Sequence, residues 1–285
     1  MSTTNRLSDF ASRLGSTLKG ICKIALQSRR ITPAACAAPG PIVILANGPS
    51  LRTTIDDCGN VLAGMTTMAV NFFANTPEFD AIRPSLYVLA DPHFFTAEGE
   101  ANVDELWRRL GSVAWPMTLY VPAREKARAV ARLGADSRVC LATFNLVGVE
   151  GFRPFERFAY GRGLGMPRPR NVLVPAIMAA MRAGYTEIYL AGADHSWMET
   201  IRVGEDNVVF NVQSHFYADT SAEKNRVVSA YRDIRLHQVL QSFYTAFAAY
   251  HRVAPYADSR HIHIYNSTPG SYIDAFPRRP LPVKS

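Results

Sequence analysis

Strand-like runs alternate with helical stretches along residues 41–277, and this alternation limits the folds open to the chain more than any other feature. The runs rich in β-branched, aliphatic and aromatic residues lie at 42–46, 66–70, 86–90, 117–121, 187–191 and 262–265, and the helical stretches lie at 101–110, 124–134, 171–183 and 223–252. Such alternation is typical of a mostly parallel sheet with helices on both faces. We therefore predict an α/β fold built on a Rossmann-like sheet.

Two segments of this predicted domain show neither the helical nor the strand repeat of apolar residues. Residues 145–170 are rich in Gly, Arg, Phe and Pro, and residues 196–222 are similarly irregular. Open α/β sheets bind ligands beside the carboxyl ends of their strands. We expect both segments to form a lid over that edge of a single domain that spans 41–277.

The positive charge of the chain is concentrated at its two ends. Of the formal net charge of +7, residues 1–40 carry +5 from six basic side chains and one aspartate, and residues 278–285 carry +3 from three basic side chains. Residues 41–277 are left near −1, which argues against nucleic acid as a partner. The four cysteines show no metal or disulfide spacing, which favours a reducing cytoplasm.

The basic segment 1–40 has an amphipathic helical pattern and ends in a linker at 31–41. Apolar residues recur every three or four positions, at Leu7, Phe10, Leu14, Leu18, Ile21 and Ala25. Such a helix can lie on an anionic membrane surface. A poorly ordered terminus, a helix docked on its own domain and a mitochondrial transit peptide are the alternatives. Since no run reaches the length of a membrane span, we expect a cytoplasmic protein peripheral to the inner face of a membrane.

Polar residues follow four of the predicted strands, at the points where the strands end. These residues are Asn47, Asn71, Asp91 and Asp194. Because the carboxyl ends of parallel strands meet at one edge, we expect the four to cluster there, next to His195. Each could instead be an ordinary turn or helix-cap residue, since Asn and Asp favour those positions.

The turn Asn47-Gly48-Pro49-Ser50 matches neither the dinucleotide fingerprint nor the P-loop. Backbone N–H groups of Gly48, Ser50 and Leu51 at a helix start could receive a phosphate or ribose oxygen. Pro49 suits the first helical position. The turn therefore predicts a nucleotide-binding loop of a different kind.

The predicted lid supplies the candidates for proton transfer and anion binding. His215 is the candidate general base and His195 its competitor, because histidine titrates near neutral pH. Tyr217 could donate to a leaving phosphate. Arg170, which follows Arg162 and Arg168 before a predicted helix, could grip an anion with paired N–H groups, or could belong to a solvated basic loop.

The chain contains no Asp-x-Asp pair, which favours chemistry without a metal ion. Asp91 and Asp194 could still share a cation if they meet, although hard cations prefer several oxygen ligands.

The order of these motifs resembles the bacterial sialyltransferases of glycosyltransferase family 42. It also resembles a related superfamily that includes motility-associated flagellin glycosyltransferases and hydroxymethylpterin pyrophosphokinases. The residues that carry the resemblance are ANGPSL (46–51), Asn71, AIMAAMRAGYTEIYLAGADHSW (176–197), SHFY (214–217) and IHIYNSTPGS (262–271).

The resemblance implies contacts to a CMP-sugar donor through Asn47 and Asn71, and a lid base at His215. Three positions depart from the family pattern. Asp91 replaces an asparagine, Asn171-Val172-Leu173 replaces a Ser/Thr-Ser-Gly run, and Ser196-Trp197 replaces phosphate-facing tyrosines. The family also implies metal-independent transfer and membrane association through a basic amphipathic end.

The leading hypothesis is a metal-independent glycosyltransferase of surface polysaccharide or glycolipid assembly. It would use a nucleotide-activated sugar, such as a CMP-linked nonulosonic acid, and a glycan or glycolipid acceptor, with no further cofactor. Asn47, Gly48, Pro49, Ser50 and Asn71 would hold the nucleotide. The alternatives are a pterin-type pyrophosphokinase that uses ATP and Mg²⁺, and a non-catalytic nucleotide-binding protein of envelope assembly. Association into a homo-oligomer is left open.

Overall fold

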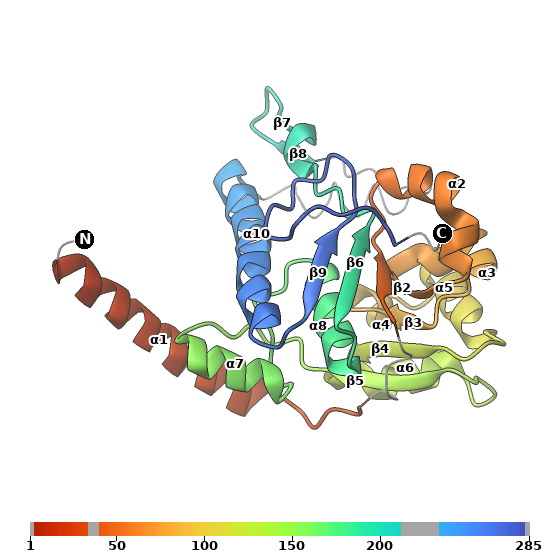
Figure 1. Ribbon diagram of the computed structural model, residues 1–285, viewed down its shortest axis with the longest axis horizontal. Coiled ribbons are helices and arrows are strands. Elements are labelled where there is room, and N and C mark those ends of the chain that lie inside the picture. Colours follow the sequence, from red (N-terminus) through yellow and green to blue (C-terminus); the bar gives the residue numbers. More distant parts are fainter. Residues whose placement is uncertain (1–2, 34–39, 212–233, 283–285) are drawn as a thin grey trace.

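The computed structural model describes residues 3–33, 40–211 and 234–282 of the chain. Within these ranges, seven parallel strands form one sheet in the order β5-β4-β3-β2-β1-β6-β9 (Figure 1). The strands are β1 (Ile42–Leu45), β2 (Thr66–Val70), β3 (Leu86–Val88), β4 (Thr118–Pro122), β5 (Cys140–Phe144), β6 (Glu187–Ala191) and β9 (His263–Asn266). The predicted α/β fold with a parallel sheet is confirmed.

Helices cover both faces of the sheet, because successive residues of each strand point to opposite sides. Ile42 and Ile44 of β1 enter one hydrophobic core, and Val43 and Leu45 enter the other. The first core is covered by α7 (Arg153–Gly161), α8 (Leu173–Ala183) and α10 (Leu236–Asp258). The second is covered by α2 (Ser50–Ala63), α3 (Glu78–Ile82), α4 (His93–Thr96), α5 (Ala101–Gly111) and α6 (Lys126–Leu133). Short 3-10 helices lie at η1 (Asn71–Asn75), η2 (Ala123–Glu125) and η3 (Trp197–Thr200).

The strand order reverses at β1, which is the topological switch point of the sheet. From β1 the chain builds outward through β2, β3, β4 and β5 on one side, and β6 and β9 then pair on the other side. The loops that leave β1 and β6 lead to helices on opposite faces of the sheet, α2 and α10. A crevice between such loops is where doubly covered sheets bind ligands.

Two elements differ from the sequence expectation. Edge strand β5 was not predicted, because it begins at exposed Cys140 and lacks a β-branched run. Helix α10 begins at Leu236, whereas the pattern predicted a start at 223, and residues 223–233 lie outside the described part of the chain.

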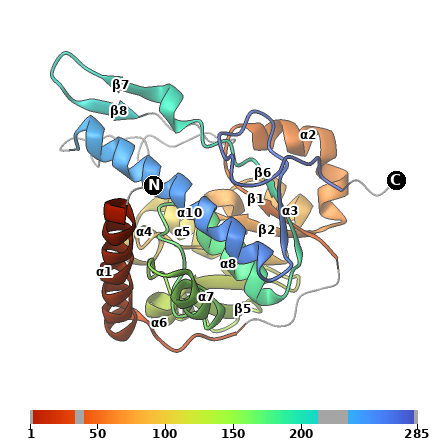
Figure 2. The ribbon, with the colours of Figure 1, turned by 60° about the vertical axis from the view of Figure 1, so that its left-hand side comes forward.

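The expected lid is partly regular structure. Residues 145–170 contain helix α7, which packs beside the N-terminal helix, so only the two ends of this segment approach the switch point (Figure 2). Residues 196–211 form η3 and a hairpin of β7 (Ile201–Val203) and β8 (Val209–Asn211). A small apolar cluster that includes Val209 and Phe243 holds this hairpin against α10. Residues 212–222 are outside the described ranges.

Helix α1 (Thr3–Gln27) packs against α7, which lies next to it in Figure 1. Gly20 lets the two helices approach closely, because a Cβ there would lie 2.8 Å from the ring of Phe155. Thr17 Oγ1 accepts a hydrogen bond from the backbone N–H of Phe152 (3.0 Å). The Phe10 and Phe152 rings are 5.3 Å apart. The alternative in which the helix docks on its own domain is therefore what the structure contains.

The chain after α1 is hydrogen-bonded to the sheet edge through Arg29 and Thr32, where the segment expected to be a linker begins. Thr143 N–H donates to Thr32 O (3.0 Å), and Thr32 N–H donates to Thr143 Oγ1 (2.6 Å). Asn145 makes a similar reciprocal pair with the backbone of Arg29. These contacts fix the end of α1 relative to β5.

A neighbouring face of α1 carries the predicted apolar residues and is largely open to solvent, with Phe10 at its border against Phe152. This apolar stripe consists of Leu7, Phe10, Leu14, Leu18 and Ile21, which are 43% to 70% exposed. Within the described ranges, no helix is long and apolar enough to cross a membrane. Helix α1 therefore has one face that contacts the rest of the protein and one apolar face that is exposed.

Candidate functional site

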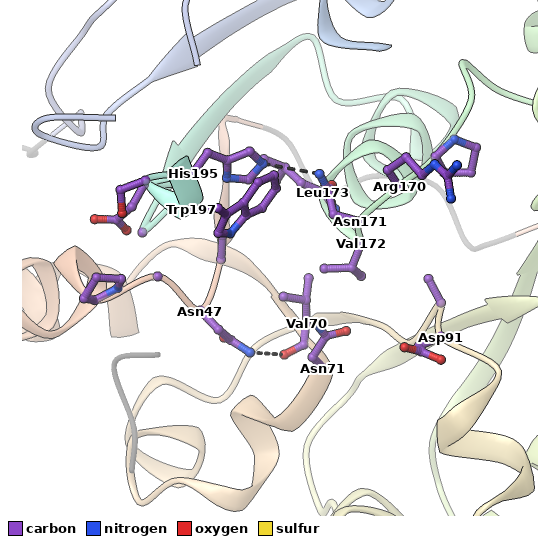
Figure 3. Close-up of a pocket in the computed structure, with 18 of the residues that line it drawn as sticks. Asn47, Val70, Asn71, Asp91, Arg170, Asn171, Val172, Leu173, His195 and Trp197 are labelled. Atoms are coloured by element: carbon purple, nitrogen blue, oxygen red, sulfur yellow. Dashed lines mark hydrogen bonds between the residues drawn. The ribbon is translucent and has the colours of Figure 1, made fainter. Parts of the chain in front are cut away.

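A cavity of about 630 Å³ opens at the carboxyl ends of the central strands (Figure 3). All four predicted strand-end residues line it, namely Asn47, Asn71, Asp91 and Asp194. The expectation that the parallel strands bring these residues together is confirmed. Other predicted site residues that line the cavity are Gly48, Pro49, Arg170, Asn171 and His195.

The loops after β1 and β6 close on each other at two glycines. Gly48 N–H donates to Gly192 O (2.8 Å), and a Cβ on Gly48 would lie 2.0 Å from Asp194 Oδ2. Gly192 has φ +69°, and a Cβ there would lie 2.3 Å from Ala46 O. Side chains at either position would push the loops apart, so the sequence requires glycine at both.

The carboxylate of Asp194 holds the start of α2. Its Oδ1 accepts from Ser50 N–H (3.2 Å), and its Oδ2 accepts from the Ser50 hydroxyl (2.8 Å). Burial raises the pKa of Asp194, and the two hydrogen bonds from Ser50 oppose that rise. Ser50 itself lies behind the cavity wall, where it positions Asp194.

The predicted phosphate-binding role of the turn is wrong in one respect. Gly48, Ser50 and Leu51 were expected to offer free backbone N–H groups, but these groups donate to Gly192 O, Asp194 Oδ1 and Gly48 O. The Asp194 carboxylate therefore already occupies the start of α2, and its negative charge would disfavour a phosphate at that position.

Asn47 presents an unsatisfied acceptor to the cavity. Its Nδ2 donates to Val70 O (3.1 Å), which fixes the orientation of the amide. Asn47 is only 8% exposed, and its buried Oδ1 has no hydrogen-bond partner among the described residues. Burying such an acceptor without a partner costs free energy, roughly 1–3 kcal/mol. A ligand that donates a hydrogen bond to Oδ1 would recover it.

Asn71 and Asp91 lie on the same side of the cavity floor as Val70, one strand apart. Asn71 adopts φ +51°, and its carbonyl accepts from the Tyr87 hydroxyl (2.5 Å). Asp91 is exposed, and its Oδ1 accepts from His93 N–H (2.9 Å). The carboxylate of Asp91 thus stays solvated and available to hydroxyl or amino donors of a ligand.

His195 lies in a buried polar cluster in the cavity wall. Its Nε2 is 2.6 Å from the Tyr250 hydroxyl and 3.3 Å from Asn171 Nδ2, and Tyr250 also lies 3.0 Å from Asn171 Oδ1. The ring of Trp197 covers the imidazole at 4.1 Å. Burial lowers the pKa of His195 to about 3, so the imidazole is neutral at physiological pH.

The positive end of a helix points into the cavity opposite the Asp194 loop. Asn171, Val172 and Leu173 form the start of α8, and all three line the cavity. Arg170 precedes them, is exposed, and makes no hydrogen bond or ion pair with the described residues. Leu173 N–H already donates to Asn171 Oδ1 (3.0 Å) and Pro175 has no N–H, so an anion on this side of the cavity would be bound mainly by the Arg170 guanidinium.

The segment after β9 supports the Asp194 loop from behind. Ala193 N–H donates to Thr268 Oγ1 (2.9 Å), and the Ser271 hydroxyl donates to Ala193 O (2.6 Å). Arg278, expected to belong to a basic tail, donates to Thr268 O (2.9 Å). The NSTPGS motif therefore positions the site without lining it.

Sequence reasoning missed three residues of the site and placed two beyond what the structure describes. Trp197 and Glu199 line the cavity, and Tyr250 orders His195 from the long helix. The proximity of Trp197 to Asp194 in the sequence was a usable signal, but nothing in the pattern of α10 distinguishes Tyr250 from a core residue. His215 and Tyr217 lie outside the described residues.

Comparison with known proteins assigns no family. No protein-family model matches the chain, and no curated protein matches it. Among solved structures, the chain is similar to the MAf glycosyltransferase from Magnetospirillum magneticum AMB-1, with a TM-score of 0.45 and 14% identity. The match covers 95% of this chain and 38% of that protein. A likeness this distant assigns no activity, and membership of family 42 stays a prediction.

Among the residues that the structure describes, no group of three or more His, Cys, Asp and Glu side chains could hold a metal ion.

We predict that Gly48→Ala destabilises the fold by at least about 2 kcal/mol, because the new Cβ would overlap the Asp194 carboxylate and the Gly192 carbonyl. Gly59→Ala, inside α2, is the matched control, since its Cβ would meet only Ile55 at 3.7 Å. The control should gain roughly 0.5–1 kcal/mol of helix propensity. Denaturant unfolding measures both, and a Gly48→Ala variant as stable as the native chain would contradict the close approach of the loops.

We also predict that His195 makes stability fall on acidification. The unfolded state binds a proton below pH 6.5, whereas the folded state does not until about pH 3. Stability should therefore decline from pH 6.5 towards 3, by up to about 1.4 kcal/mol per pH unit more than in a His195→Gln variant. Unfolding at pH 7, 6, 5 and 4 measures the slopes. Exposed His237→Gln is the control, and equal slopes for the native chain and His195→Gln would refute the burial of a neutral imidazole.

Proposed function

We propose that the chain is a glycosyltransferase that binds a nucleotide-activated sugar in the cavity at the β1/β6 switch point. The unpartnered Oδ1 of buried Asn47, a residue that lines the cavity, carries this proposal, because a ligand amino or hydroxyl group would supply the hydrogen-bond donor that the described residues do not. The fold supports a nucleotide as that ligand, since crevices at such switch points commonly bind nucleotides. The motif order described above supports a sugar transfer.

The donor has one favourable orientation along the cavity. Asn47 Oδ1 and the Asp91 carboxylate accept hydrogen bonds, so they suit amino groups of a base and ribose hydroxyls. The phosphate belongs at Arg170 and the start of α8, away from Asp91 and Asp194. The finer proposal is a CMP-linked nonulosonic acid, transferred without a metal ion.

The acceptor approaches over η3. A second cavity of about 640 Å³ on the surface of α10 is lined by Met198, Tyr244 and Tyr272 among others. The Tyr272 hydroxyl donates to Glu199 Oε1 (2.6 Å), and Glu199 lines the donor cavity. Tyrosine-lined surfaces with polar neighbours suit sugars. We assign the acceptor glycan to this surface, the general base to His215, and the orientation of a reacting hydroxyl to Asp194.

The apolar stripe of α1 gives this enzyme a membrane-peripheral location at the inner face of a membrane. Five large apolar side chains are exposed on one face of the helix, while the other face is fixed to the body. A helix of this kind lies in the headgroup region with its apolar side inward. The acceptor is then a glycolipid or nascent surface polysaccharide.

We predict that the thermal transition rises with the concentration of one nucleotide in a screen of CMP, UDP, GDP and ATP. Arg170→Ala should weaken the binding of that nucleotide about tenfold and leave its nucleoside unaffected, because a charge-assisted contact to phosphate is lost. Arg168→Ala, in the same loop but outside the cavity, is the control. No shift with any nucleotide, or equal losses for both variants, would overturn the placement of the donor.

We predict that His215→Ala lowers the rate of sugar transfer by about 10²–10⁴-fold while donor binding persists, since a general base contributes that much. His237→Ala, an exposed position on α10, should transfer at the native rate. Native turnover by His215→Ala would reject the assignment. Activity that survives EDTA rejects the pyrophosphokinase alternative, and transfer or donor hydrolysis by the purified chain rejects a non-catalytic role.

A further inference from the structure

A cavity of about 290 Å³ lies between α1, α7 and α10, on the side of the molecule where Figure 2 shows these helices. Its wall contains four arginines, Arg13, Arg153, Arg157 and Arg252, and two carboxylates, Asp9 and Glu156. None of these residues lines the cavity at the sheet edge. The volume is at the lower end for ligand sites, which suits a small charged group better than a nucleotide.

Two of the arginines are already neutralised. Arg13 Nε is 3.1 Å from Asp9 Oδ2, and Arg252 pairs with Glu156. Glu156 is buried, and its Oε1 also accepts from Gly151 N–H (2.9 Å). Both carboxylates of the wall therefore have partners, and neither is available to the remaining arginines.

Arg153 and Arg157 make no hydrogen bond or ion pair with any described residue. They are four positions apart and so share one face of α7, where like charges disfavour the helix. The cavity thus holds two uncompensated guanidinium groups on the same wall. Two guanidinium forks together grip the oxygens of a phosphate group, which matches their planar geometry and charge.

The walls are held in place by the docking of α1. Gly151, at φ +153°, lies against Thr17, whose hydroxyl oxygen accepts from the next backbone N–H, that of Phe152. The Tyr160 hydroxyl at the base of the cavity donates to Val149 O (2.7 Å). The cavity is therefore a feature of the folded chain and exists only while α1 is docked.

The same helix carries the apolar stripe. Asp9 and Arg13 of the cavity wall alternate along α1 with Leu7, Phe10 and Leu14 of the stripe. A ligand that fits both features has a terminal phosphate joined to hydrocarbon chains. We propose that this arginine cavity binds the phosphomonoester or diphosphate group of a membrane lipid, with the stripe immersed beside it. The proposal does not depend on glycosyl transfer.

The test is vesicle flotation of the full chain with phosphatidylcholine vesicles that contain phosphatidic acid or phosphatidylglycerol, matched in surface potential. We expect tighter binding to phosphatidic acid, whose terminal phosphate is accessible. Arg153→Ala/Arg157→Ala should weaken that binding by at least about tenfold and abolish the preference. Arg138→Ala/Arg168→Ala, which removes two charges outside the cavity, is the matched control. Equal binding of both lipids by the native chain, or a preference that persists in the first variant, would overturn the proposal.

A double variant of the apolar stripe tests whether the cavity binds the phosphate of a lipid or a soluble phosphate. Leu14→Ser/Leu18→Ser removes part of the stripe and leaves the cavity intact, so it should lose vesicle binding yet still bind inorganic pyrophosphate in calorimetry. If this variant binds phosphatidic acid vesicles as the native chain does, the ligand is not held as a lipid and the proposal fails. Gly20→Leu should undock α1 and abolish both vesicle binding and pyrophosphate binding. Gly15→Leu is the control and should retain both, because Gly15 has open space around it.

Discussion

The close approach of the loops after β1 and β6 is the constraint on which the site depends. Glycines at 48 and 192 remove the side chains that would separate the loops, and Asp194 then ties them to the start of α2 through Ser50. This arrangement fixes the backbone at the one point where the strand order reverses. It also leaves the Asn47 amide with a donor satisfied and an acceptor free. The shape of the proposed ligand site therefore depends on the geometry of two backbone loops.

The charges around the cavity are divided between its two sides. Carboxylates of Asp91 and Asp194 lie on the strand-end side, and the Asp194 charge occupies the helix terminus that would otherwise attract a phosphate. Arg170 and the start of α8 supply the positive side. Between them His195 is neutral, because burial opposes its protonation. Such a division orients a ligand that has hydrogen-bond donors at one end and negative charge at the other.

Helix α1 combines two roles that a sequence pattern does not separate. Its docked face meets α7 at Gly20 and Thr17 and helps to form the arginine cavity, while its apolar stripe stays exposed. A contiguous exposed stripe of large apolar side chains indicates an interaction surface. The docked face fixes the orientation of the helix, and α1 carries both the stripe and part of the cavity wall.

The sequence by itself determined the sheet, the alternation of helices and the identity of the four strand-end residues, because hydrophobic periodicity and turn chemistry are local properties. It did not predict β5, which pairs with β4 and is hydrogen-bonded to Thr32 at the sheet edge, nor the role of Tyr250, which reaches His195 across 55 positions of the chain. It also suggested free N–H groups at the turn after Asn47. Only the tertiary structure decided that Asp194 takes one of them and that Arg153 and Arg157 have no partner among the described residues, since hydrogen bonds and ion pairs between distant segments depend on which side chains the fold brings together.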